Sequence, residues 1–385
     1  MAVLRFRYWT GFPALRAARR TRPGRSPQLV ERPTGTAVRI GVVGAGAIGR
    51  RHVQYCVDEP ATTLIGIADP ASDAASLAHE FGVPHFRSLE DMLDAQRIDG
   101  IIVAVPTPLH CKVALTAIRR GIAVLIEKPI TEHPAEATEL IATANSTGAK
   151  ILVGHHRRHN PIVQVARDIV TSELGQLQAV NVLWAVLKPR SYFEPQWRRV
   201  AGAGPVLTNL VHDVDLLRFM CGEIVNVTAA ARRSARRHEV EDTVAVLLHF
   251  ESGALGTITG CDASPSPWSW DANSGENPNF PVSRENSYRF LGSDGSLEFP
   301  DLHLWRYRID GEAGWTRPIS REARVVMPED AYRLQLRHFC RVIDEQEQPL
   351  VSAEDARRSL QVTAAILRSA GTGQTVDPSE IRDAG

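Results

Sequence analysis

The stretch VRIGVVGAGAIGR, residues 38–50, decides the fold of this chain of 385 residues. The apolar run 38–43 leads into Gly44-Ala45-Gly46-Ala47-Ile48-Gly49, a pattern that predicts a strand, a tight turn and a helix. A second apolar run ends at Asp69, 20 residues after Gly49, where a carboxylate can accept hydrogen bonds from an adenosine ribose. The combination indicates a dinucleotide-binding site. The plain alternative is a glycine-rich turn that only tightens the fold.

Each glycine of the turn has its own predicted role. Gly44 lets the chain leave the strand, Gly46 removes a side chain where the backbone approaches a pyrophosphate, and Gly49 lets the helix pack closely on the strand. The helix that starts at Ala47 and Ile48 points its free N–H groups at the phosphates. Asp69 would repel a 2′-phosphate, and residues 70–72 supply no arginine to bind one. The sequence therefore predicts NAD rather than NADP.

Composition excludes several classes of protein. The chain has 44 basic and 44 acidic residues, so no global positive field would hold nucleic acid or an anionic membrane. No apolar run approaches the ~18 residues of a membrane helix. The five cysteines form no CxxC pair, which suits reduced thiols and a cytoplasmic protein. The length allows about two domains.

The first 36 residues differ from the rest. They are rich in arginine, and their first acid is Glu31. A transit peptide has this composition. The prolines and glycines between Pro23 and Gly35 favour a disordered extension instead. Translation from an upstream start codon could be the origin of such an extension.

Residues 37–157 alternate between predicted strands and helices, which indicates a doubly wound parallel sheet. Ligands of such sheets bind outside the carboxyl ends of the strands. The loops to inspect are therefore 44–49, 69–71, 106–110, 127–130 and 154–160.

Residues 158–385 have a different texture. Strands are predicted at 178–187, 224–231, 243–250, 255–260, 288–291 and 302–308, with hairpin turns at Gly253 and Gly295. One helix, Pro205 to Met220, interrupts them, and two amphipathic helices follow at 330–346 and 353–370. The fold class is an α/β Rossmann domain plus an α+β domain with a large, mostly antiparallel open sheet. The helix at about 353–370 could pack back on the first domain.

Several motifs follow one another along the chain: the glycine turn, Asp69, Pro106-Thr107-Pro108-x-His110, Glu127-Lys128-Pro129, and a helix bearing His212-x-x-Asp215. In this order they resemble the Gfo/Idh/MocA family of nicotinamide-dependent oxidoreductases, which includes glucose-fructose oxidoreductase and inositol dehydrogenases. The resemblance covers about Val38 to the C-terminus. It implies hydride transfer at a carbinol carbon and a C-terminal sheet that binds substrate and often mediates homo-oligomers, here a dimer or tetramer.

Lys128 is the first predicted catalytic residue. An ammonium at a strand end beside the nicotinamide can hydrogen-bond the substrate oxygen and stabilise alkoxide character. The plain alternative is a solvated lysine paired with Glu127. Pro106 and Thr107 are expected near the nicotinamide ribose. Glu127, Lys128 and His110 are counted with the cofactor site, although His110 could instead cap or pack at a helix start.

His212 is the predicted proton carrier, because an imidazole exchanges protons near neutral pH. The alternative is a packed helix histidine. Inositol-dehydrogenase-like members place an aspartate one turn earlier, where this chain has Thr208 with Asn209 beside it. Threonine brings no charge, so it would not raise the pKa of the imidazole as a carboxylate would. By its helix position, Asp215 shares a face with His212, and Asp213 does not.

Two further segments could contact the substrate. By resemblance His156 and Arg157 face it, whereas a basic loop that shields the phosphates or pairs with acids is the alternative. The spacing of the three histidines in 155–159 lacks a matching ligand set, so no metal is predicted. The aromatic residues Tyr192, Phe193, Trp197, Trp268, Trp270 and Phe280 suit sugar stacking or a subunit interface. Trp197, Asn209 and His212 are counted with the substrate site.

The predicted function is an NAD-dependent dehydrogenase that interconverts a secondary alcohol and a ketone on a polyol, sugar or cyclitol. Two alternatives remain open at this point. One is an enzyme that uses tightly bound NAD transiently for epimerisation, elimination or glycoside cleavage. The other is a non-catalytic protein whose NAD binding controls a partner.

Overall fold

The computed structural model describes residues 36–200, 202–307 and 313–381. The predicted N-terminal extension, residues 1–36, lies outside the described residues apart from Thr36. All five cysteines lie within them, and none forms a disulfide. No helix of the described chain is long and apolar enough to cross a membrane.

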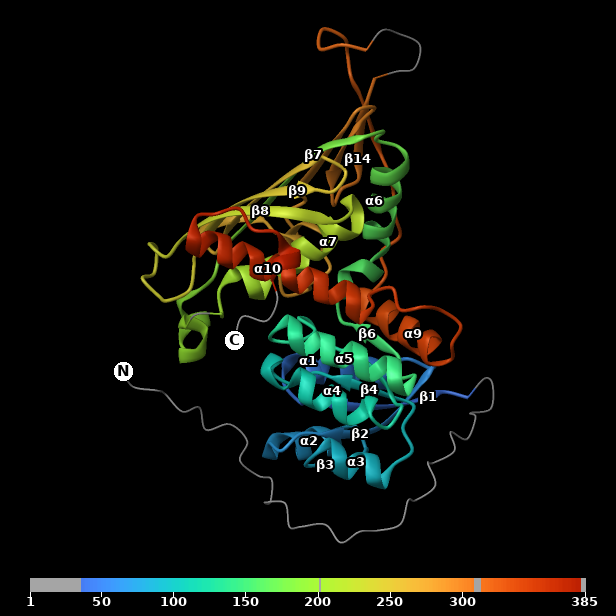
Figure 1. Ribbon diagram of the computed structural model, residues 1–385. Coiled ribbons are helices and arrows are strands. Elements are labelled where there is room, and N and C mark those ends of the chain that lie inside the picture. The colour runs from blue at the N-terminus through green and yellow to red at the C-terminus, as the bar shows by residue number, and fades with distance from the viewer. Residues whose placement is uncertain (1–35, 201, 308–312, 382–385) are drawn as a thin grey trace. The chain divides into compact units, whose positions relative to one another are not determined.

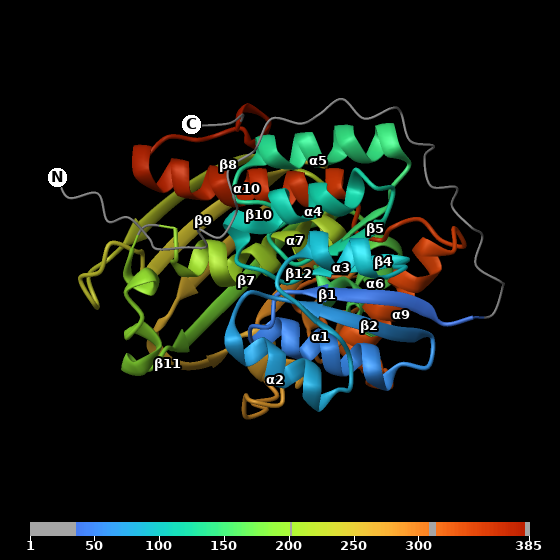
Figure 2. The same ribbon diagram turned by 90° about the horizontal axis from the view of Figure 1, so that it is seen from below.

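Sheet A is parallel, six-stranded and ordered β3-β2-β1-β4-β5-β6, as Figures 1 and 2 show. Its strands are β1 (Val38–Val43), β2 (Thr62–Ala68), β3 (His85–Phe86), β4 (Gly100–Val103), β5 (Ala123–Ile126) and β6 (Ile151–Val153). The strand order reverses between β1 and β4, and this switch point is where dinucleotides bind in such sheets. The predicted Rossmann fold is confirmed.

Helices cover both faces of sheet A. Figure 2 shows α1 (Ala47–Asp58) and α2 (Ser72–Glu80) on one side of the strands, with α4 (His110–Ile118) and α5 (Pro134–Thr147) on the other. The short α3 (Leu89–Ala95) packs beside α4. Local signals set several ends: the Ser88 hydroxyl accepts from the Asp91 N–H at 3.1 Å, and Gly148 ends α5 with a φ of 77°.

Sheet B has nine strands in the order β15-β14-β13-β12-β7-β10-β9-β8, with β11 paired to β7. They are β7 (Leu177–Leu187), β8 (Ile224–Arg232), β9 (Thr243–Phe250), β10 (Leu255–Cys261), β11 (Ala263–Trp268), β12 (Tyr288–Gly292), β13 (Ser296–Phe299), β14 (His303–Arg306) and β15 (Ser320–Ala323). β7 and β10 pair in parallel and the other pairs are antiparallel. The predicted mostly antiparallel sheet is confirmed. β11, β13 and β15 were not predicted, because strands this short carry little periodicity.

The helix α10 (Ala353–Thr372) contacts α5 and β6 of the first sheet's layer as well as β8 and α7 (Val211–Cys221), as Figure 1 shows. Its Leu360 belongs to the hydrophobic core around sheet A, whereas its Val362 and Ile366 belong to the core around sheet B. The helix α9 (Ala331–Ile343) precedes α10 in the chain, and α6 (Pro161–Ser172) packs on α7. One long helix therefore takes part in both cores.

The predicted helix Pro205 to Met220 is wrong in its first turns. Val206–Leu210 forms a π-helical turn, and the α-helix α7 begins only at Val211. The N–H of Val206 donates to the buried carboxylate of Glu241 at 2.9 Å, and the Thr208 hydroxyl donates back to the Gly204 carbonyl at 2.9 Å. These bonds hold a wider turn than an α-helix would have. Such π-turns are frequent at functional sites.

Candidate active site

The glycine turn has the backbone that a phosphate site needs. Gly44 has a φ of +98°, and a Cβ there would lie 2.5 Å from the carbonyl oxygen of Ala104. A Cβ on Gly49 would lie 1.9 Å from the carbonyl oxygen of Gly44, whereas one on Gly46 would meet no atom within 4 Å. Gly46 is the N-cap residue of α1, so no side chain caps its first turn. The N–H groups there are accordingly open to an anion, and the residues fit a dinucleotide.

Asp69 closes the other side of this turn. Its Oδ2 accepts from the N–H of Ala45 at 2.7 Å and its Oδ1 from the N–H of Ala71 at 2.8 Å. The guanidinium of Arg50 pairs instead with Asp73 at 2.9 Å. The carboxylate of Asp69 is thus fixed at the mouth of the glycine turn, where it would meet the adenosine ribose.

The loop after β4 contains three residues predicted for the cofactor site, and they differ in exposure. Pro106 is exposed and Thr107 is half-buried at the start of a 3-10 turn. His110 is only 1% exposed, with its ring nitrogens 2.8 Å and 2.9 Å from the carbonyl oxygens of Pro129 and Val105. Burial lowers the pKa of His110 despite these acceptors. His110 therefore holds the loop that bears Lys128 against the loop after β4.

Glu127 is buried and lies 2.7 Å from Nε2 of His52 on α1. Burial, the largest single cause, would raise its pKa, but the hydrogen bond and charge of His52 together with the charges of His156 and Lys128 lower the pKa of Glu127 to about 2. The pair connects the helix of the glycine turn to the strand end that carries Lys128. Sequence reasoning missed His52, since nothing in its spacing marks it.

Lys128 is half-buried, and a cis peptide bond joins it to Pro129. Its Nζ donates to the Thr208 carbonyl oxygen at 3.4 Å, so it reaches the π-turn rather than solvent. Burial lowers the pKa of Lys128, and the nearby carboxylate of Glu127 only partly offsets this. The lysine therefore faces the helix that bears His212.

His212 is buried among other basic groups. Its ring centroid lies 5.4 Å from that of His156 and 6.2 Å from that of His155, and its Nδ1 has no hydrogen-bond partner. Burial, with the charges of Lys128 and Arg157, lowers its pKa well below the ordinary range of imidazole. A neutral imidazole with a free nitrogen is a proton acceptor. Among the described residues, no group of three or more histidines, cysteines and acids is arranged to hold a metal ion.

The residues flanking His212 on its helix turn away from it. The Asp213 carboxylate accepts from the Tyr288 hydroxyl and lies 3.8 Å from Arg157. Burial raises the pKa of Asp213 to about 6 against the charge of Arg157. Arg157 is itself buried, and its Nε and Nη1 have no hydrogen-bond partner. A substrate or cofactor oxygen could take these donors.

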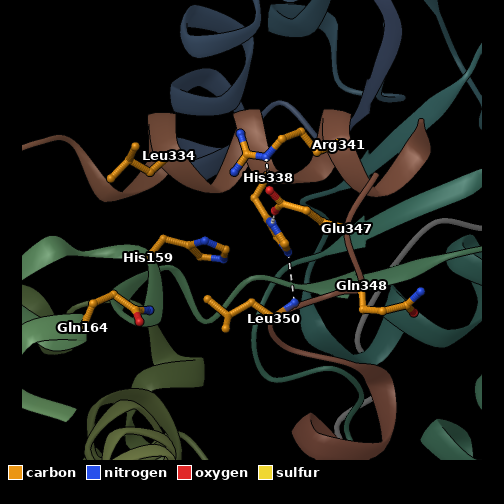
Figure 3. Close-up of a pocket in the computed structure, with 8 residues that line it drawn as sticks. All are labelled: His159, Gln164, Leu334, His338, Arg341, Glu347, Gln348 and Leu350. Carbon is orange, nitrogen blue, oxygen red and sulfur yellow. Dashed lines mark hydrogen bonds and ion pairs between the residues drawn. The ribbon is translucent and has the colours of Figure 1, made fainter. Parts of the chain in front are cut away.

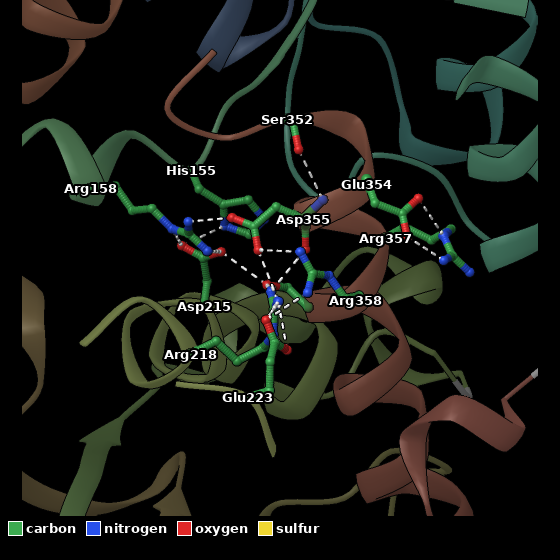
Figure 4. A network of polar contacts seen from close by, with 11 residues as sticks. His155, Arg158, Asp215, Arg218, Glu223, Ser352, Glu354, Asp355, Arg357 and Arg358 are labelled. Carbon is green, nitrogen blue, oxygen red and sulfur yellow. Dashed lines mark hydrogen bonds and ion pairs between the residues drawn. The ribbon is translucent and has the colours of Figure 1, made fainter. Parts of the chain in front are cut away.

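Asp215 serves a buried ion network rather than His212, as Figure 4 shows. It accepts from Nε and Nη2 of Arg158 at 2.8 Å and 2.7 Å, and lies 3.5 Å from Nδ1 of His155. Arg158 also pairs with Asp355 on α10, which in turn binds Arg218. The network fixes the 155–159 loop between α7 and α10. Asp215 therefore positions this loop, and its carboxylate binds Arg158 rather than His212.

His156 is held on two sides. Its Nε2 lies 2.9 Å from Glu276, and its ring stacks on Tyr332 with a centroid distance of 4.0 Å. Tyr332 also lies under the guanidinium of Arg51 on α1. Trp270 donates to Glu276 at 3.0 Å and is fully buried in the core around sheet B. The expectation that Trp270 stacks on sugar or forms an interface is therefore wrong.

The two remaining predicted substrate residues lie apart. The Asn209 side chain accepts from Nζ of Lys188, at the end of β7, at 2.9 Å. Trp197 is 46% exposed in the segment after β7 and has the guanidinium of Arg198 over its ring. Lys188 was missed, although a cation at a strand end is the signal that marked Lys128. Glu276 and Tyr332 carry no such signal, because they come from loops and helices far along the chain.

One cavity of about 460 Å³ lies between His159, at the end of the 155–159 loop, and α9 (Figure 3). It is lined by His159, Gln164, Leu334, His338, Arg341, Glu347, Gln348 and Leu350. Both ring nitrogens of His338 are engaged, by Glu347 at 2.7 Å and by the Leu350 N–H at 2.9 Å. The glycine turn, Lys128 and His212 do not line this cavity, so it is separate from the candidate active site.

Comparison with known proteins shows the family to which this chain belongs. Residues 38–155 match the Gfo/Idh/MocA model described as oxidoreductase family, NAD-binding Rossmann fold, and residues 167–377 match the model of its C-terminal alpha/beta domain. A 1,5-anhydro-D-fructose reductase of Ensifer adhaerens is 26% identical over 88% of this chain and 98% of its own length. An inositol 2-dehydrogenase of Rhizobium meliloti is 25% identical over 86% and 96%.

The similarity extends to solved structures. The crystal structure of a putative NADPH-dependent oxidoreductase from Desulfitobacterium hafniense has a TM-score of 0.77 at 19% identity, covering 90% of this chain and 99% of its own. At this identity the likeness concerns the fold alone.

Proposed function

Because the chain belongs to the Gfo/Idh/MocA family of NAD-binding oxidoreductases, we propose that it oxidises a secondary alcohol of a polyol, sugar or cyclitol to the ketone and catalyses the reverse reduction. The observation that carries the proposal is the meeting of Lys128 and His212 at one turn. Lys128 donates to the Thr208 carbonyl at 3.4 Å, and His212 follows four residues later with a free Nδ1.

Lys128 and His212 have different roles at the carbinol. The Lys128 ammonium binds the substrate oxygen and stabilises the negative charge that develops on it. The neutral His212 imidazole accepts the hydroxyl proton in oxidation and returns it in reduction. The dinucleotide, when bound, supplies the hydride acceptor. Arg157, with two unpartnered donors, orients a second substrate oxygen.

We propose NAD as the preferred cofactor. The Asp69 carboxylate bonds the Ala45 N–H at 2.7 Å and so lies at the ribose end of the glycine turn. Its charge repels a 2′-phosphate. Arg50, the arginine nearest to this corner in sequence, is engaged by Asp73 at 2.9 Å.

Homo-oligomerisation through sheet B is part of the proposal. Register places Leu291 of β12, Ala179 of β7 and Leu255 of β10 in one row across the sheet. Leu255 and Leu291 are 46% and 43% exposed, and apolar area of this kind suits a second copy of the chain. Light scattering should give a dimer or tetramer, and a Leu255→Lys variant should shift it toward the monomer.

The test of the dehydrogenase is direct. Purified protein with NAD or NADP and a panel of inositols, sugars and hydroxy acids should produce the reduced nicotinamide with at least one substrate. Lys128→Met should lower kcat by about 100-fold or more while NAD binding is retained. Lys112→Met, on the exposed face of α4, is the matched control. Full kcat in Lys128→Met removes the lysine from the mechanism. Product without net reduction of cofactor would favour transient use of bound NAD.

A further inference from the structure

Another cavity, which is lined by basic side chains, opens beside the candidate active site. It has a volume of about 480 Å³ and lies between the end of β7, the segment 190–199 and the connection from β8 to β9. Its lining includes Lys188, Arg190, Arg199 and Arg236, and none of the described residues that line it is acidic.

The inner wall of this cavity carries an excess of positive charge. The side chains of Lys188 and Arg236 are only 10% and 18% exposed, and both pair with the single buried carboxylate of Asp262. Two other acids lie nearby, and both accept from uncharged donors. Glu241 accepts the Val206 N–H at 2.9 Å, and burial raises its pKa. The buried carboxylate of Asp242 accepts from the Ala235 N–H and the Thr243 hydroxyl. Burying two cations against one carboxylate is costly unless another anion completes the set.

Aromatic rings hold these cations in place. The Lys188 ammonium lies 4.7 Å from the Tyr192 ring centroid, and the Arg236 guanidinium lies 4.3 Å from that of Phe193. Arg199 donates to the backbone carbonyls of Phe193 and Glu194 rather than to an acid. These ring and carbonyl contacts fix the three cations in place without adding a second carboxylate to that of Asp262.

The cavity adjoins the proposed site of hydride transfer. Lys188 donates to the Asn209 side chain at 2.9 Å, and Lys128 donates to the carbonyl of the preceding residue, Thr208, at 3.4 Å. The two lysines thus approach neighbouring residues of the same π-turn. One small molecule could place its carbinol at Lys128 and an anionic group at Lys188.

We propose that this cavity is a subsite for an anionic group of the substrate, a carboxylate or a phosphate, and that Lys188 and Arg236 select for it. The inference rests on the proposed dehydrogenase function, since it concerns the substrate of the same site. The preferred substrates would accordingly be acidic or phosphorylated sugars or cyclitols rather than their neutral parents.

The experiment compares matched ligands on the NAD-loaded protein: D-glucose, D-glucuronate and D-glucose 6-phosphate, and D-galactose with D-galacturonate. Calorimetry measures binding independently of turnover, and formation of reduced nicotinamide measures kcat and KM. At least one anion should bind 10-fold or more tightly than its neutral parent, and added NaCl should weaken it. Comparison of glucuronate with glucose 6-phosphate tells which group the subsite takes.

Variants assign the effect to the cavity. Arg236→Gln should weaken anion binding about 10-fold and leave the neutral parent within twofold. Arg199→Gln, at the rim, should do the same more weakly and replaces Arg236→Gln if that variant misfolds. Arg321→Gln, exposed on the distant β15, is the matched control and should change nothing.

The outcomes separate the two proposals. Anion-selective binding without any reduced nicotinamide leaves the subsite standing and overturns the dehydrogenase. Turnover of neutral sugars at equal or higher kcat/KM, or unchanged anion affinity in Arg236→Gln and Arg199→Gln, overturns the subsite alone. Neither binding nor turnover of any ligand overturns both.

Discussion

The Nε2 atom of His52 lies 2.7 Å from Oε1 of Glu127, and both side chains are buried. His52 belongs to α1, whose first turn faces the predicted pyrophosphate site, and Glu127 directly precedes Lys128. A contact between residues 75 positions apart thus joins the cofactor-binding helix to the strand end that carries the proposed catalytic lysine.

The first prediction concerns this pair. His52→Ala should lower the free energy of unfolding at pH 7 by about 3–5 kcal/mol, because it leaves a buried carboxylate without its partner. His52→Gln keeps a donor and should recover part of the loss. Because the folded pKa of Glu127 is lowered to about 2, its contribution is complete above about pH 4.3 and is lost as pH falls toward 2.

Urea unfolding at pH 7 and pH 3 measures both effects. His79→Ala, exposed on α2, is the control. Equal stability of His52→Ala and the parent protein at pH 7 would show that the pair is not a structural link.

The second prediction concerns His212. Its pKa is lowered by burial and by the charges of Lys128 and Arg157, so the imidazole stays neutral well into the acid range. The acid limb of kcat/KM for alcohol oxidation should therefore lie at lower pH than an ordinary imidazole, with a pKa of about 6.5, would give. Thr208→Asp would place a carboxylate one turn earlier and should move this limb upward by about one pH unit or more.

The pH profile of kcat/KM in the parent, Thr208→Asp and the control Thr171→Asp on α6 decides this. A limb that stays in place in Thr208→Asp would mean that another group carries the proton. His212→Asn should lower kcat by about 100-fold or more.

The third prediction is that replacing Asp213 raises stability and lowers activity. Burial raises its folded pKa to about 6, above the unfolded value of about 3.9. The folded state therefore holds the proton more tightly, and stability is lost as pH rises from about 4 through 6. Asp213→Asn cannot ionise, so it should gain on the order of 3 kcal/mol at pH 8 and almost nothing at pH 4.

Activity should fall in the same variant, because Arg157 loses the charge 3.8 Å from its guanidinium. Denaturant unfolding at several pH values measures the gain in stability, and kcat and KM measure the loss of activity. The exposed Asp168→Asn on α6 is the control. A destabilised Asp213→Asn at pH 8 would contradict the argument.

The fourth prediction concerns the cofactor. The parent protein should bind NAD at least about 10-fold more tightly than NADP, since the charge of Asp69 repels a 2′-phosphate. Asp69→Asn keeps an acceptor for the Ala45 N–H and removes the charge, so NADP should gain most of that factor while NAD weakens only a few-fold.

Fluorescence titration with NADH and NADPH gives the two dissociation constants, and the exposed Asp94→Asn on α3 is the control. Tighter binding of NADPH than of NADH by the parent protein would overturn the proposed preference.

Local signals in the sequence predicted much of the fold. The strand Thr243–Phe250 has the predicted bounds, and the last long helix begins at the predicted Ala353, because an alternating apolar run and a helix start are each complete within a few residues. The π-turn at Val206–Leu210 was not predictable in this way. It depends on Glu241, which is 35 residues away and accepts the Val206 N–H.

What the sequence by itself determined is therefore the class of protein: a glycine turn, an acid at the ribose distance and a lysine at a strand end, each defined by neighbours along the chain. Only the tertiary structure decided the surroundings of those groups. His52 meets Glu127, Tyr332 stacks on His156, and Lys188 reaches Asn209 across 21 to 176 positions. Burial and charge from distant segments set the pKa of His212, and no local pattern encodes them.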